Sequence, residues 1–155
     1  MISYGKHNFC FTFHNLILCT FKIKMTTRDE IISQVRGTSF GKLTSETSED
    51  EFFQNETLRP ILKLQNDLLL AVFENYLSKN KVVFQQFSVE KKLNFIENAI
   101  QKDIKFRNSL KGMVIGLFTL EEYNRYITNS SALNKRMMNL IIERIKSQVQ
   151  LIVNS

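Results

Sequence analysis

From Leu58 onward, apolar residues recur at intervals of three and four, the spacing that places side chains along one face of an α-helix. The pattern predicts an amphipathic core helix of about five turns between Leu58 and Tyr76. Thr57 or Asn55 can cap this helix, and Pro60 falls in its first turn, where a missing N–H costs little.

The same period predicts further helices on both sides of this one. They run from Thr27 to about Val35, after a cap at Ser88, over Phe106–Phe118, from a cap at Thr119, and from Ala132 to about Val153. Short helical turns are expected at 48–53 and 82–87, and Thr38–Ser48 reads as a polar loop. The chain is therefore predicted to be all-α, an irregular helical bundle of about five helices in a single domain.

Each predicted helix has an apolar side that we expect to face the core, and most have a recognisable start. The inward sets include Ile31, Ile32 and Val35 in the first helix, Leu93, Ile96, Ile100 and Ile104 in the Ser88 helix, and Leu120, Tyr123 and Ile127 in the Thr119 helix. Capping-box spacing occurs at Thr27/Glu30, Ser48/Glu51 and Thr119/Glu122, and Asn129–Ser131 is expected to cap the last helix.

Residues 1–24 differ from the rest of the chain, being rich in Phe and lacking a sustained helix or strand period. Three interpretations are open: a signal peptide, an N-terminal arm that packs on the domain, or sequence upstream of a start at Met25. A well-formed helix cap directly behind Met25 favours the third. The predicted organisation is thus a leader over 1–24 that is non-native or disordered, followed by one helical domain over 25–155.

The formal charge of +6 and the pI near 9.4 do not describe the predicted helical domain alone. Lys6, Lys22 and Lys24 lie in the first 24 residues, which hold no Asp or Glu, so half of the net charge belongs to that segment. No run of eighteen apolar residues is present, so no membrane span is expected and the predicted location is the cytoplasm.

Both histidines and both cysteines (His7, His14, Cys10 and Cys19) also fall in the first 24 residues. Residues 25–155 therefore offer no disulfide, no Cys/His zinc site and no histidine for acid–base catalysis. The acidic residues cluster at helix starts, where the helix dipole favours negative charge. The sequence accordingly predicts no catalytic residue, no metal site and no cofactor.

Arg107 and Lys111 are the most unusual pair in the chain. At helical spacing they align with Ile104, Val114 and Phe118, although two like charges four residues apart on an apolar stripe repel each other. One interpretation is an anion-binding site inside the bundle, with Asn108 as a further ligand. The other is that both side chains lie along the edge of the core with their charged ends in water.

The remaining features point to partners rather than to chemistry. The last helix has a wide apolar arc, which predicts an unidentified protein partner or a homodimer through that helix. Gly112 and Gly116 have the spacing that permits close helix packing, within the monomer or between copies. Lys91, Lys92, Lys102, Lys105, Arg107 and Lys111 with Phe95 and Phe106 form a thin nucleic-acid pattern, and acidic residues interrupt it.

Three stretches, Gln54–Leu77, Glu97–Tyr123 and Asn129–Gln148, resemble a family of short uncharacterised bacterial proteins. Members of that family often carry the name glyoxalase, so the resemblance implies a helical fold and a lactoylglutathione lyase activity. Known glyoxalase folds hold their metal through histidine and glutamate, or through a histidine-rich H-x-H-x-D-H motif. Residues 25–155 have no histidine, so no such metal ligand can be matched to this sequence.

Overall fold

The computed structural model describes residues 27–37 and 48–149, and in these residues it is all-α, as the sequence predicts. The described residues contain eight α-helical segments rather than about five. They are α1 (Arg28–Arg36), α2 (Glu49–Phe53), α3 (Arg59–Leu64), α4 (Asn66–Lys79), α5 (Val89–Lys102), α6 (Ile104–Ile115), α7 (Leu120–Thr128) and α8 (Ser130–Ser147). A π-helical turn, η2 (Gln54–Leu58), and a 3-10 turn, η3 (Phe84–Gln86), complete the elements.

The helix predicted to begin at Leu58 begins at Glu49 and passes through Pro60. Proline lacks the N–H of a helical hydrogen bond and crowds the preceding turn, and the π turn η2 lies directly before it. There the Arg59 N–H donates to the Gln54 carbonyl, one residue further back than in an α-helix. The expected cap at Thr57 is wrong, because this residue lies inside the helical path with its hydroxyl bonded elsewhere.

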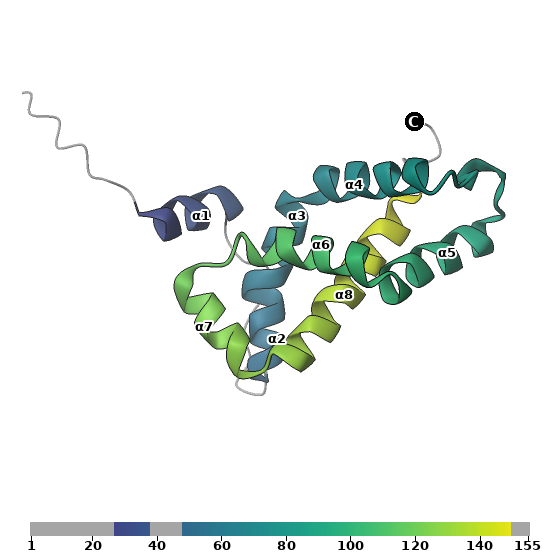
Figure 1. The fold of residues 1–155 in the computed structure, drawn as a ribbon. Coiled ribbons are helices and arrows are strands. Elements are labelled where there is room, and N and C mark those ends of the chain that lie inside the picture. Colours follow the sequence, from purple (N-terminus) through teal and green to yellow (C-terminus); the bar gives the residue numbers. More distant parts are fainter. Residues whose placement is uncertain (1–26, 38–47, 150–155) are drawn as a thin grey trace, which may run out of the picture.

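The long helix also bends, at Gln65, so its second half leaves in a new direction. The backbone of Gln65 (φ −88°, ψ 5°) departs from the helical region and separates α3 from α4. In Figure 1, α2 and α3 form one column, α4 runs away from its top, and α5 returns beneath α4. α6 then crosses the centre of the molecule to α7, and α8 rises obliquely past α6 toward α4.

α8 is the central helix of the bundle and contacts η2, α3, α4, α5, α6 and α7. Its buried side chains are Leu133, Met137, Met138, Ile141, Ile142 and Ile145, all members of one core cluster. The wide apolar arc of this helix is thus used within the described part of the monomer and gives no argument for a dimer. The sequence beyond 149, where the arc was expected to continue, lies outside the described residues, as do 1–26 and the predicted loop from 38 to 47.

Helix starts follow the sequence prediction closely. Reciprocal capping boxes form at Thr27/Glu30 and Thr119/Glu122, and the Glu51 N–H donates to the Ser48 hydroxyl. α8 is the exception. It begins at Ser130, and the side chain of its first flanking residue, Asn129, donates to Asp50 instead of capping the helix.

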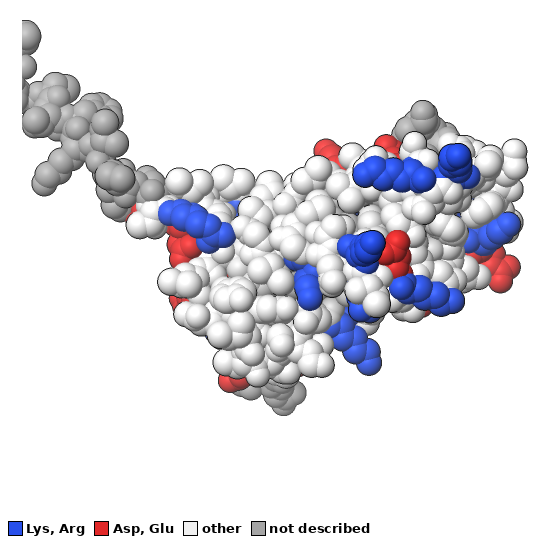
Figure 2. Space-filling model, viewed as in Figure 1, with Lys and Arg blue, Asp and Glu red and all other residues white. Residues whose placement is uncertain are grey.

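Two predicted inward faces point outward instead. α7 buries Tyr126, whereas Leu120, Tyr123 and Ile127 are exposed. In α1 only Ile32 is buried, and Ile31 and Val35 are exposed. Figure 2 shows that most of the α7 surface on this face carries no charged side chain. Both helices are short and lie at the rim of the bundle, so polar contacts rather than an apolar stripe set their orientation.

The two glycines of α6 do not mark a close approach between helices. Gly112 is exposed, and a Cβ added there would meet no atom within 4 Å. A Cβ at Gly116 would meet only the carbonyls of Gly112 and Met113, one turn earlier in the same chain. The expectation of tight packing against a neighbouring helix of the monomer is therefore wrong for this pair.

Candidate anion-binding site

A pocket of about 430 Å³ lies where the end of α5 meets α6 and α8. In Figure 2, most of the visible Lys and Arg side chains are spread over the right half of the molecule, across α4, α5 and α6. The pocket is lined by Gln101 of α5, by Arg107, Asn108 and Lys111 of α6, and by Ser131, Asn134, Lys135, Met138 and Asn139 of α8. The three residues that the sequence predicted as an anion site therefore border one concavity.

α6 presents Arg107 and Lys111 on the flank of its buried face. The Asp103 carboxylate accepts a hydrogen bond from the Phe106 N–H at 3.0 Å and so fixes where the helix begins. Phe106, Leu110 and Val114 are then buried, and Arg107 and Lys111 lie beside them, half-buried. Ile104, expected on the same apolar stripe, is 61% exposed, so the pair borders the core rather than facing into it.

α8 supplies the opposite wall and a third cation that the sequence did not reveal. Ser131, Asn134, Lys135, Met138 and Asn139 follow one another at helical spacing, so they share a face of α8. This polar face is visible in the sequence. Its position opposite Arg107 and Lys111 is not, because it depends on how α6 and α8 pack.

Hydrogen bonds inside the site leave several donors available to a ligand. Arg107 donates to the Gln101 carbonyl at 3.3 Å, at the end of α5, which uses one of its five N–H groups. The side-chain oxygen of Asn134 accepts from the Tyr126 hydroxyl at 2.9 Å, so its NH₂ group remains to donate. Lys111 and Lys135 form no hydrogen bond or ion pair with any residue in the described ranges.

The charges of the pocket are not neutralised by its walls. None of the described residues that line it is Asp or Glu, although the lining holds one Arg and two Lys. Like charges held near one another on a partly buried surface are unfavourable unless an anion or water relieves them. This arrangement is suited to a ligand with two or more negative charges.

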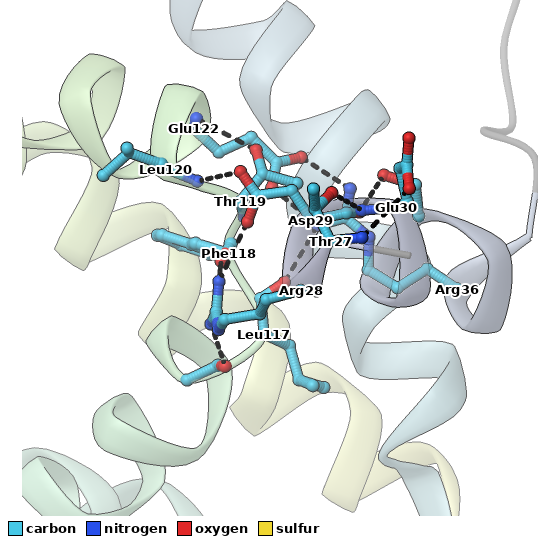
Figure 3. A network of polar contacts seen from close by, with 12 residues as sticks. Thr27, Arg28, Asp29, Glu30, Arg36, Leu117, Phe118, Thr119, Leu120 and Glu122 are labelled. Carbon is cyan, nitrogen blue, oxygen red and sulfur yellow. Dashed lines mark hydrogen bonds and ion pairs between the residues drawn. The ribbon is translucent and has the colours of Figure 1, made fainter. Parts of the chain in front are cut away.

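A second polar cluster lies at the junction of α1 with the α6–α7 turn (Figure 3). Arg36 and Glu122 form two hydrogen bonds of 2.7 and 2.6 Å, and their side chains are 9% and 13% exposed. The Thr57 hydroxyl and the Thr119 N–H also donate to Glu122, at 2.8 and 2.7 Å. Burial raises the pKa of Glu122, but the bonds from Arg36, Thr119 and Thr57 outweigh it, so the pKa is lowered.

This cluster holds α1 in place. Arg28 donates to the carbonyls of Gly116 and Phe118 at 2.8 Å each, and the Leu120 N–H donates to Asp29 at 2.9 Å. These contacts satisfy backbone groups at the end of α6 and the start of α7. Because the Glu122 oxygens are already occupied by hydrogen bonds, we interpret the cluster as the contact that docks α1 on the α6–α7 turn.

The nucleic-acid pattern loses its aromatic component in the fold. Phe106 is buried and stacks on Tyr76, with ring centroids 4.1 Å apart, and Phe95 packs against the core. Lys92 is buried over the ring of Phe84. These rings are therefore not available to stack on bases, which a single-stranded nucleic-acid site requires.

The described ranges contain neither a metal cluster nor a membrane-spanning helix. No group of three or more His, Cys, Asp or Glu side chains there is arranged to hold a metal ion, and the histidines and cysteines of the chain lie outside these ranges. None of the helices in residues 27–37 and 48–149 has the length and apolar character needed to cross a membrane. No family model, curated protein or solved structure matches this chain.

Proposed function

We propose that this protein is a ligand-binding helical bundle whose pocket between α6 and α8 takes a small anion. The observation that carries the proposal is the grouping of Arg107, Lys111 and Lys135 around one concavity, with no carboxylate among the described residues that line it. A pocket of about 430 Å³ falls within the range of small-molecule sites, roughly 300–1,000 Å³.

The geometry favours a pocket ligand over a long polyanion. A nucleic acid is bound along an extended basic surface with stacking platforms. Here the cations come from two helices that border one pocket, and the nearby rings are in the core. A compact anion can accept hydrogen bonds from both helices at once, which a polymer on the surface cannot do as fully.

The proposal is tested by the thermal midpoint of unfolding in phosphate or sulfate, compared with chloride at equal ionic strength. A ligand that binds only the folded state stabilises it by about 2.7 kcal/mol at 100 times its dissociation constant. Such a gain corresponds to a rise of several degrees in a domain of this size. The chloride comparison removes the general effect of ionic strength.

Variants assign the effect to the pocket. Lys111→Met and Lys135→Met should each reduce the anion-specific rise, and together they should remove it. Lys105→Met is the matched control, because Lys105 lies on α6, is exposed and does not line the pocket. An equal response of the wild type and all four variants would contradict the proposal.

A further inference from the structure

The pocket is larger than an inorganic anion requires. Its volume of about 430 Å³ leaves room for an organic body beside an anionic group. Besides the three cations, the lining offers one hydroxyl, four side-chain amides and one apolar side chain, Met138. The chemistry of these neutral groups indicates what the rest of the ligand is, provided that the proposed anion site is correct.

The cations favour a phosphate group over a carboxylate. A phosphomonoester carries a charge of nearly −2 near neutral pH and has three terminal oxygens that accept hydrogen bonds. Arg107 and Lys111 approach from α6 and Lys135 from α8, so several oxygens are needed to serve donors on both sides. A carboxylate has a single charge and two oxygens, which leaves more of the positive charge unrelieved.

The neutral lining favours hydroxyl groups. Asn108 and Asn139 each carry a side-chain amide, which both donates and accepts hydrogen bonds, and a sugar hydroxyl does the same. The Gln101 NH₂ group donates to Glu97 at 3.1 Å, so its amide oxygen remains to accept. An apolar ligand body would displace water from these amides without replacing its hydrogen bonds, at a cost to binding. A body rich in hydroxyls avoids this cost.

The same lining disfavours a nucleotide. Bases are commonly held by stacking on aromatic rings or on flat guanidinium groups. No aromatic side chain is among the described residues that line the pocket, and Arg107 already bonds the Gln101 carbonyl. We propose that the pocket binds a phosphorylated polyol of the sugar phosphate class, an inference that rests on the proposed anion site.

Calorimetric titration of the full chain with four probes tests this inference. The probes are inorganic phosphate, ribose 5-phosphate, ribose and adenosine 5′-monophosphate, which is ribose phosphate with a base attached. Ribose 5-phosphate should bind at least tenfold more tightly than inorganic phosphate, ribose alone should not bind measurably, and the monophosphate nucleotide should bind no more tightly than ribose 5-phosphate.

Two variants separate the two halves of the pocket. Asn139→Leu should remove most of the advantage of ribose 5-phosphate over inorganic phosphate while leaving phosphate affinity unchanged. Lys135→Met should weaken both. Asn139 and Lys135 are exposed, so both variants should fold, which circular dichroism checks.

The outcomes distinguish the ligand class from the anion site itself. Ribose 5-phosphate that binds no better than phosphate, or a nucleotide that binds tenfold more tightly than ribose 5-phosphate, would overturn the sugar phosphate inference and leave the anion site standing. Failure of every phosphate-bearing probe to bind would overturn the anion site as well.

Discussion

The side chains of Arg36 and Glu122 meet at 2.6 Å and join α1 to α7 across a large stretch of sequence. Both are largely buried, so the attraction between them is little screened by water. Removal of one partner leaves the other charge buried without its counterion. This pair should therefore matter more to stability than the exposed ion pairs of the molecule.

Glu122→Gln should lower the free energy of unfolding by about 3 kcal/mol, the lower part of the range for breaking a buried ion pair. Chemical denaturation monitored by circular dichroism measures the change. Glu121→Gln is the matched control, since Glu121 is an exposed neighbour in the same first turn and should cost only a few tenths of a kcal/mol. Equal effects of the two substitutions would show that the pair does not hold α1 in place.

The same carboxylate predicts how stability depends on pH. The pKa of Glu122 is lowered in the folded protein, so the unfolded state takes up a proton first as the pH falls. Its contribution is fully present above the unfolded value of 4.5 and is lost as the pH drops through the lower folded value.

Unfolding curves between pH 7 and pH 3 should show this loss in the wild type and a shallower one in Glu122→Gln. Glu97→Gln serves for comparison, because Lys146 lowers the pKa of Glu97 where 44% of the Glu97 side chain is exposed and solvent screens the interaction. Identical pH slopes in the wild type and Glu122→Gln would refute the assignment.

Exposed and buried isoleucines on neighbouring helices provide another test. Ile127 of α7 is 53% exposed, although its spacing predicts a core position, whereas Ile141 of α8 is fully buried. Ile141→Ala should cost about 2–5 kcal/mol, and Ile127→Ala less than about 1 kcal/mol. A loss at Ile127 as large as that at Ile141 would mean that a partner or another segment covers α7.

Local signals predicted local features well. The capping boxes at Thr27 and Thr119 and the short helical turn expected at 82–87 follow from short-range chemistry, because the residues that make them are neighbours in sequence. The all-α fold follows from the same periodicity. The outward stripe of α7 does not, because an amphipathic pattern shows which residues share a face and not what that face meets.

One wall of the candidate site could be predicted from the sequence, and the other could not. Arg107 and Lys111 stand out because their charges interrupt an apolar period, and the fold places them with the neighbouring Asn108 on one pocket wall. Lys135 looks like an ordinary surface residue until α8 is packed against α6. The bend at Gln65 and the π turn before Pro60 were likewise hidden, since a helical period continues through both.

Residue-resolved NMR tests anion binding in the pocket between α6 and α8 most directly. Phosphate is titrated into the ¹⁵N-labelled full chain at constant ionic strength, with chloride as the balancing anion. Saturable shifts should concentrate in residues 107–111 of α6 and 131–139 of α8, and they should disappear in the Lys111→Met, Lys135→Met double variant. Shifts that grow linearly without saturation, or that centre on other basic residues such as Lys79 or Lys105, would contradict the anion site.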